Sequence, residues 1–189
     1  MWPMDCIAHK RDGQVLTADE IRRFIADYTA GRIADYQAAA WLMAIYLQGM
    51  TDEETTELTL AMAKSGDIVD LSSIPGIKVD KHSTGGIADT TTLIVAPLVA
   101  AAGVPVAKPG NRALSSKSGT ADALSCLGVK LDIGPADIAR CVHDAGLGFM
   151  FAQLHHPAMK HVGPSRVELG TRTIFNLLGP LSNPGGVKR

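Results

Sequence analysis

Apolar side chains recur at three- and four-residue intervals through the first 66 residues, which is the spacing of helices with one buried face. Two capping boxes, Thr17 with Glu20 and Thr51 with Glu54, mark the starts of two such helices. Asp35 is placed to cap another helix between them. Each helix runs into a glycine, namely Gly31, Gly49 and Gly66. The pattern predicts three short antiparallel helices.

After residue 76 short β-branched runs alternate with alanine-rich helical segments. The runs cover 77–80, 104–108 and 149–152, and residues 72–76 form a linker before the first of them. Alternation of strands and helices is typical of a mostly parallel sheet. We therefore expect an α/β protein with a small all-helical domain over residues 1–70 and a partial α/β domain over 71–155, followed by a return to helix at 158–178.

The predicted sheet is incomplete. Only about three strands can be found, fewer than an open α/β sheet usually has. Residues 179–186 form a Pro/Gly turn with no element after it. We therefore expect either a truncated gene product or the front part of a larger protein.

Composition narrows the class of protein. Hydrophobic residues make up 46% of the 189 residues and charged residues 20%, which suits a globular core. The net charge of −1 argues against a general nucleic-acid binder, because no basic excess is present to neutralise a phosphate backbone. Three widely separated cysteines suit reduced thiols, and the longest apolar stretch, 93–106, is too short to cross a bilayer. We expect a soluble cytoplasmic protein with no membrane partner.

The segment 81–86, between a strand-like run and a helix-like segment, is the first candidate site. It reads Lys81-His82-Ser83-Thr84-Gly85-Gly86. A Gly-rich turn at this place lets backbone N–H groups converge on an anion, and the helix N-terminus adds partial positive charge. Lys81 supplies a full charge, while Ser83 and Thr84 supply hydroxyl donors. The segment is either a phosphate cradle or an ordinary βα turn with two glycines.

A second Gly/Ser loop covers 108–120, between the strand at 104–107 and a helix at 121–127. Lys108, Arg112 and Lys117 give it three cations beside several hydroxyl groups. Two loops at the carboxyl ends of parallel strands face the same crevice, so the pair favours an anion site more strongly than one loop does. The alternative is a solvated basic loop.

A histidine-rich stretch follows the third strand. His155 and His156 are adjacent and point to different faces, and no Cys or carboxylate falls at ligand spacing, so we expect no metal site there. Arg166 starts an apolar-periodic helix. It either faces inward, where it can bind a carboxylate or carbonyl, or lies at the surface.

Roughly the first 108 residues resemble pyrimidine-nucleoside (thymidine) phosphorylases. The resemblance rests on collinear motifs, among them Lys10-Arg11-Asp12-Gly13, Gly49-Met50-Thr51-Asp52 and Val79-Asp80-Lys81-His82-Ser83-Thr84-Gly85-Gly86. From Pro109 onward the chain instead resembles anthranilate phosphoribosyltransferase. The motifs there are Gly110-Asn111-Arg112, Ser115-Ser116-Lys117-Ser118-Gly119, His156-Pro157-Ala158-Met159-Lys160 and Arg172-Thr173-Ile174-Phe175-Asn176-Leu177-Leu178-Gly179-Pro180.

Both families share the glycosyltransferase family 3 fold (nucleoside phosphorylase/phosphoribosyltransferase fold), in which a helical domain joins an α/β domain and the active site lies in the cleft between them. The resemblance implies that helices within 156–189 complete the helical domain. It also implies a homodimer formed through that domain.

The phosphorylase resemblance implies roles for single residues. Lys81, Ser83, Thr92 and Thr120 would hold phosphate, with Thr84, Gly85 and Gly86 in the same loop, and His82 and Arg166 would contact the base as catalytic residues. One departure stands out, because Gly110 occupies the place of a phosphorylase serine. The downstream serine and lysine that grip the pyrimidine also have no counterpart at 174–189.

The transferase resemblance implies a different use of the second loop. Lys108, Ser116 and Ser118 would hold phosphoribosyl pyrophosphate, and Asn111 and Arg166 would contact anthranilate. The first loop departs from that family, since it would read Gly-Thr-Gly-Gly-Asp where this chain has Ser83-Thr84-Gly85-Gly86-Ile87. The acidic pair that binds Mg²⁺ in that family would lie beyond residue 189.

The expected activity is therefore pentosyl transfer to or from an anomeric carbon. Our main prediction is phosphorolysis of a pyrimidine nucleoside, with inorganic phosphate as co-substrate and no cofactor. The alternative is an anthranilate phosphoribosyltransferase that uses phosphoribosyl pyrophosphate and Mg²⁺. A second alternative is an inactive dimerising module.

Overall fold

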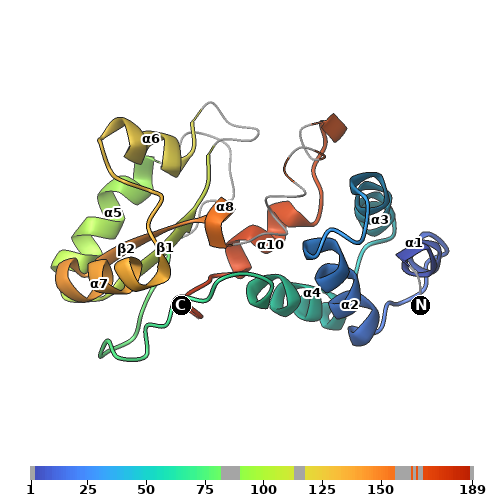
Figure 1. Cartoon of the computed structure of the whole chain (residues 1–189), viewed down its shortest axis with the longest axis horizontal. Helices are drawn as coiled ribbons and strands as arrows, with labels where there is room; N and C mark the ends of the chain where they lie inside the picture. Colours follow the sequence, from blue (N-terminus) through green and yellow to red (C-terminus); the bar gives the residue numbers. More distant parts are fainter. Residues whose placement is uncertain are drawn as a thin grey trace. The chain divides into compact units, whose positions relative to one another are not determined.

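The structure is a computed structural model that describes residues 3–81, 90–112, 118–155, 163, 165 and 168–187. It forms two compact units, shown in Figure 1. The helical unit comprises Met1–Gly66 and His156–Ser182, and the α/β unit comprises Asp67–His155 and Asn183–Arg189. A helical part and a partial α/β part with a parallel sheet confirm the predicted fold class.

The described helices of the helical unit include α1 (Pro3–Arg11), α2 (Ala18–Thr29), α3 (Asp35–Gln48), α4 (Asp52–Lys64) and α10 (Phe175–Leu181). Both predicted capping boxes are confirmed at the starts of α2 and α4. At α2 the Glu20 N–H donates to the Thr17 hydroxyl over 3.3 Å, and the Thr17 N–H donates to the Glu20 carboxylate over 2.7 Å. Each box provides hydrogen-bond acceptors for backbone N–H groups that have no partner within the first turn of the helix.

Two predictions about these helices are wrong. The first 66 residues contain a fourth helix, α1, which the pattern did not reveal because its buried side chains are one cysteine and one lysine rather than an apolar stripe. Asp35 does not cap α3 but is its first residue. Ala34 is the cap residue, and the Gln37 side-chain oxygen accepts a hydrogen bond from its N–H over 3.1 Å.

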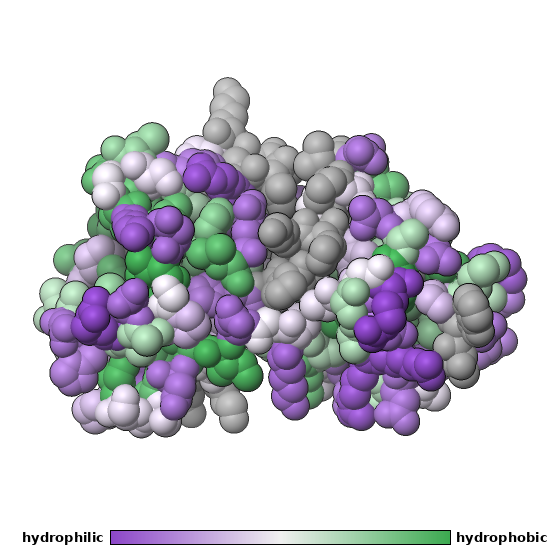
Figure 2. Space-filling model, in the orientation of Figure 1, coloured by the Kyte–Doolittle hydropathy of each residue, from purple (hydrophilic) through white to green (hydrophobic). Residues whose placement is uncertain are grey.

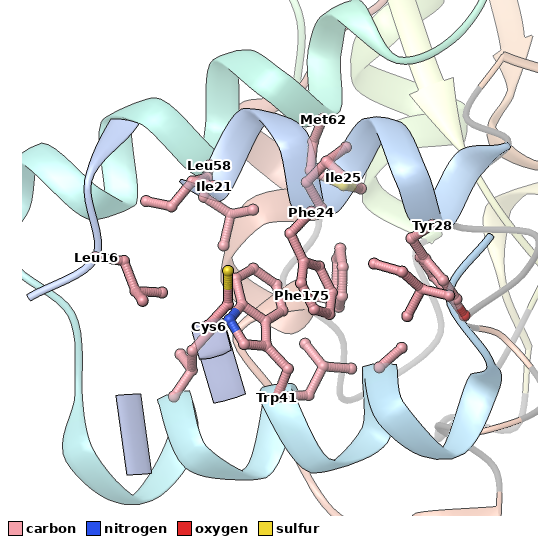
Figure 3. Packing of buried hydrophobic residues seen from close by; sticks show 14 of the residues in the cluster. Cys6, Leu16, Ile21, Phe24, Ile25, Tyr28, Trp41, Leu58, Met62 and Phe175 are labelled. Atoms are coloured by element: carbon pink, nitrogen blue, oxygen red, sulfur yellow. The ribbon is translucent and has the colours of Figure 1, made fainter. Parts of the chain in front are cut away.

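An aromatic pair lies in the core of the helical unit. The rings of Phe24 and Trp41 stack with their centroids 4.1 Å apart and their planes 21° from parallel. Phe175 and Leu178 of α10 belong to the same buried cluster, as Figure 3 shows for Phe175. A segment more than a hundred residues downstream of the other helices therefore helps to close their core.

A buried ion pair ties α1 to α4. Lys10 Nζ donates to both carboxylate oxygens of Glu54 over 2.8 and 3.0 Å, and the two residues are 4% and 2% exposed. Glu54 also accepts from the N–H groups of Leu16 and Thr51, each over 2.7 Å. Burial acts to raise the pKa of Glu54, but these donors and the charge of Lys10 outweigh it, so the pKa lies below its ordinary value.

Replacing Glu54 with glutamine is expected to destabilise the helical unit by about 3 kcal/mol, because Lys10 is left as a buried charge without its partner. Glu57→Gln is the matched control on α4, since Glu57 pairs with Arg22, whose side chain is 56% exposed, and such pairs contribute under about 1 kcal/mol. Urea unfolding of the three proteins measures the difference. Equal losses in both variants would contradict the account.

The same pair predicts a pH dependence. A carboxyl whose folded pKa is depressed contributes stability above its unfolded pKa, near 4.5 for Glu, and loses that contribution as the pH falls through the folded value. The gap in unfolding free energy between the unsubstituted chain and Glu54→Gln should therefore be constant at neutral pH and shrink below about pH 4.

The described elements of the α/β unit are α5 (Thr90–Ala101), β1 (Val106–Gly110), α6 (Thr120–Cys126), α7 (Pro135–Ala145), β2 (Leu147–Phe151) and α8 (Ala152–His155). β1 pairs in parallel with β2, with Val106 opposite Leu147 and Gly110 opposite Phe151. On its other edge β1 meets Val79 through a parallel bridge to Val106. The described sheet therefore places Val79 first, β1 in the middle and β2 last.

Two expectations about this unit need correction. The run at 77–80 is not a strand of its own, because only Val79 forms a bridge, in which it donates to Pro105 O and accepts from the Ala107 N–H, each over 3.0 Å. Residues 72–76 are not a free linker either. Ile74 is buried in the same apolar cluster as Ala107 and Met150, so this stretch belongs to the α/β unit.

The α/β unit also presents apolar side chains at its surface, some of which can be followed in Figure 2. Ile94 and Leu98, one turn apart on α5, are 63% and 64% exposed. Among the residues that the structure describes, no helix has the length and apolar character needed to cross a membrane.

Candidate functional site

Both predicted anion loops begin at the same edge of the sheet. Lys81 follows the bridge at Val79, and Asn111 and Arg112 follow the carboxyl end of β1. Because Val79 and β1 run in parallel, their carboxyl ends point the same way, which is where ligands bind in open α/β sheets. The sheet thus places the start of each loop at one common edge.

Beneath this edge lies a buried polar cluster. The ammonium group of Lys108 lies 3.8 Å from Asp80 Oδ1, an oxygen that accepts no hydrogen bond within the described residues. Asn183 Nδ2 donates to Asp80 Oδ2 over 3.2 Å and to the Ala107 carbonyl over 3.1 Å. We call Asp80, Lys108 and Asn183 the strand-end cluster.

Burial governs the electrostatics of this cluster. The Lys108 and Asp80 side chains are 3% and 10% exposed. Burial raises the pKa of Asp80 above its ordinary value, although the charge of Lys108 and the hydrogen bond from Asn183 act in the opposite direction. Lys108 also donates to the Pro109 carbonyl, so its ammonium group is held near the carboxyl end of β1, where the second loop begins.

Four further predicted site residues are described. Thr92 and Thr120 are buried, at 2% and 6% exposure, in the first turns of α5 and α6. Ser118 is half-buried just before α6. Asn111 is half-buried after β1, where its side-chain oxygen accepts from the Arg112 N–H over 2.8 Å. Thr120 and Asn111 lie near each other, because the Ala121 N–H donates to the Asn111 carbonyl over 3.2 Å.

The other predicted site residues lie outside the described part of the chain: His82, Ser83, Thr84, Gly85, Gly86, Ser116 and Arg166. Their roles stay predictions.

Arg112 is held on the surface side of the second loop. Its guanidinium group donates to Asp122 over 3.1 Å and lies 5.8 Å from the centre of the Phe151 ring. Asp122 in turn accepts from the Gly119 N–H over 3.0 Å at the start of α6. These contacts fix both ends of the second loop to the α6 N-terminus.

His155 ends α8 and is only 1% exposed, and within the described residues neither ring nitrogen has a hydrogen-bond partner. Burial lowers the pKa of the His155 ring below its ordinary value, although Asp67 acts to raise it. In the described part of the chain no three His, Cys, Asp or Glu side chains come together as a metal site would require. These residues by themselves do not form a magnesium site, and we assign no step to a metal.

Comparison with protein families gives two matches. Residues 76–189 match the glycosyl transferase family a/b domain, and residues 4–66 match the helical bundle domain of the same family. The chain belongs to the glycosyl transferase family. Its two domains are found in the order of the helical and α/β units described above.

Individual family members narrow the comparison. An anthranilate phosphoribosyltransferase from Rhizobium johnstonii is 51% identical over 186 residues, and one from Rhizobium meliloti is 53% identical over 179 residues. These alignments cover 97% and 93% of this chain but only 54% and 52% of the relatives. The chain therefore spans about half the length of the curated relatives that it matches.

A solved family member agrees with the fold. The crystal structure of anthranilate phosphoribosyltransferase (TrpD) from Thermus thermophilus superimposes with a TM-score of 0.85 at 38% identity. The match covers 97% of this chain and 56% of that chain.

These matches overturn our main prediction. Pyrimidine-nucleoside phosphorolysis, with its thymidine phosphorylase and pyrimidine metabolism associations, is wrong as the leading assignment. Relatives with about 50% identity that carry the transferase name align across nearly the whole chain, including the first 108 residues that resemble the phosphorylases. The sequence motif at 81–86 therefore did not predict which reaction the family members are named for.

Gly110 shows a packing constraint in this family member that points the same way. A Cβ atom added to Gly110 would lie 2.6 Å from Phe149 Cε2 and 2.8 Å from Phe149 Cζ. Carbon atoms do not approach so closely, so a serine here requires the ring or the strand to move. In this structure the tip of the Phe149 ring lies where a side chain at position 110 would begin.

Three residues of the site escaped sequence analysis: Asp80, Phe149 and Asn183. Asp80 carried one signal, a carboxylate at the end of an apolar run next to Lys81. Asn183 lies in a Pro/Gly segment that reads as a plain turn, and only the tertiary fold brings it to Asp80.

Gly110→Ser is expected to destabilise the α/β unit by about 1–3 kcal/mol, the usual cost of overpacking. Gly134→Ser is the matched control, because a Cβ there meets nothing within 4 Å and serine is a favoured residue at a helix N-cap. Denaturant unfolding of both variants measures the costs. A Gly110→Ser protein as stable as the control would show that the ring contact imposes no constraint.

Proposed function

We propose that this chain is the phosphoribosyl-pyrophosphate-binding part of an anthranilate phosphoribosyltransferase, an enzyme of tryptophan biosynthesis. The similarity to relatives of that name supports the proposal. The observation that carries it in the structure is the close contact between Gly110 and the Phe149 ring, since a serine at position 110 would require that ring to move.

The reaction joins an aromatic amine to a pentose. The amine nitrogen forms a bond to the anomeric carbon, the bond from that carbon to a pyrophosphate oxygen breaks, pyrophosphate leaves with the electron pair, and the amine loses a proton. The transition state is electron-poor at the anomeric carbon, so catalysis depends on positioning and on stabilising the departing anion.

The described residues suit the anion end of this reaction. Lys81 and Lys108 supply positive charge at the common strand edge, and Ser118 and Thr120 supply hydroxyl groups around the start of α6. Lys108 is oriented by the strand-end cluster rather than left to move in solvent. Ser116 belongs to the same proposed group of ligands.

Among the described residues, Asn111 is the proposed contact for the acceptor, and Arg166, which lies outside them, is retained as a second proposed contact from the resemblance. It follows β1 directly, next to Gly110 and the Phe149 ring, so an aromatic acceptor here would meet both an amide and an aromatic surface. His82 is retained as a proposed site residue from the resemblance.

Magnesium is the metal that this assignment implies. Since the described residues do not form a site for it, Mg²⁺ enters only as a component of the assays.

We also propose that the chain forms a homodimer through its helical unit. Helix α3 exposes Tyr36 and Leu47, at 76% and 75%, which is apolar surface that an association of two chains can bury. Light scattering should give the mass of two chains. The mass of one chain at all concentrations would contradict the dimer.

The assay that tests the proposed function follows the fluorescence of anthranilate in the presence of the chain, phosphoribosyl pyrophosphate and Mg²⁺. We expect anthranilate to be consumed and no thymine to be released from thymidine at any phosphate concentration. Calorimetry should show binding of phosphoribosyl pyrophosphate with Mg²⁺. The absence of both phosphoribosyl pyrophosphate binding and anthranilate consumption would overturn the proposal, and so would phosphorolysis of thymidine.

A further inference from the structure

Asn183 joins three segments of the α/β unit that are far apart in the sequence. Its amide nitrogen reaches Asp80, at the base of the first loop, and the carbonyl of Ala107, in the strand that leads to the second loop. Its amide oxygen accepts from the Gly185 N–H over 2.8 Å, which folds the segment after residue 182 into a tight turn. Asn183 is only 7% exposed.

A second hydrogen bond fastens the same segment to the unit. The Val69 N–H donates to the Pro184 carbonyl over 3.1 Å. Gly185 packs closely against Leu71, since a Cβ atom added to Gly185 would lie only 3.0 Å from Leu71 Cδ1. The residues around Asn183 therefore have a fixed position beneath the loop edge. They are not a loose tail within the described structure.

The charge arrangement makes Asn183 more than a packing residue. Asp80 has one oxygen near the ammonium group of Lys108 and the other hydrogen-bonded to Asn183. A neutral amide donor can hold a buried carboxylate without cancelling its charge, so that charge remains available to orient Lys108.

We propose that Asn183 and Asp80 are positioning residues for the anion site, holding Lys108 and the bases of both loops in register for phosphoribosyl pyrophosphate. This inference rests on the proposed function, since it names the support of the same site. Neither residue is assigned a contact with substrate. Their effect passes through Lys108 and the strand ends.

Two substitutions at Asn183 test the proposal. Asn183→Ala removes both donors, and we expect it to weaken binding of phosphoribosyl pyrophosphate with Mg²⁺ by about tenfold or more, the effect of losing buried hydrogen bonds to a charged group. Asn183→Asp places a second carboxylate about 3 Å from Asp80, where like charges cannot both ionise easily.

The aspartate variant has a signature that a purely structural role would not give. Within the described residues, the charged groups that act on the neighbouring Asp80 are Lys108 and Lys81. Protonation of the carboxylate pair at low pH restores an O–H donor, so binding by Asn183→Asp, relative to the unsubstituted chain at the same pH, should recover as the pH is lowered from neutral. Binding by Asn183→Ala should show no such recovery.

Asn176→Ala is the matched control. Asn176 accepts from the Thr173 N–H over 3.0 Å, so its loss removes a comparable amide contact that belongs to the helical unit. We expect it to bind phosphoribosyl pyrophosphate as the unsubstituted chain does, even where its melting temperature falls by as much as that of Asn183→Ala.

The outcomes separate the two proposals. If the unsubstituted chain does not bind phosphoribosyl pyrophosphate with Mg²⁺, the proposed function fails and this inference fails with it. If the unsubstituted chain binds and folded Asn183 variants bind equally well, or lose affinity only in proportion to stability as Asn176→Ala does, the positioning role alone is overturned.

Discussion

Two opposite charges, on Asp80 and Lys108, lie buried where two parallel strand segments end. Charges in such a place must be compensated, since each alone would lose the solvation that water provides. Their proximity depends on the parallel bridge between Val79 and Val106 and on Asn183, which holds the second carboxylate oxygen. This compensation and the parallel bridge together connect the residues at the base of each loop.

The helical unit uses the same physical device for a different purpose. Glu54 neutralises the buried Lys10 while accepting two backbone N–H groups, so one carboxylate joins the start of α4 to α1 and to the chain before α2. Around it an aromatic pair and α10 complete an apolar core. A segment late in the sequence thus stabilises early helices, whereas the segment beginning at Asn183 rejoins the α/β unit.

Local patterns predicted much of this fold. The capping boxes at Thr17 and Thr51 needed only three neighbouring residues to be recognised, and alternation of strands and helices was enough to predict a parallel sheet. Helix α1 was missed because a lysine is buried there through its partner on α4, which no local pattern reveals. The contacts of Asn183 and of Phe149 with Gly110 likewise join distant residues, so they arise only from the tertiary fold.

The reaction was harder to predict than the fold class. A loop of lysine, hydroxyls and glycines favours an anion site, but the same chemistry suits orthophosphate and a diphosphate equally well. What separates the two lies in neighbours such as Gly110, whose missing side chain becomes informative only when the Phe149 ring is seen against it.

Amide hydrogen exchange tests most directly whether the strand-end cluster couples the segments at the base of the two loops, so that they open and close together. The amides of Val79, Ala107 and Gly185 donate to Pro105, Val79 and Asn183 respectively, and so report on the three joined segments. Adding phosphoribosyl pyrophosphate with Mg²⁺ should slow exchange at all three amides together. Slower exchange at only one of them, or at none while the ligand is bound, would contradict the account.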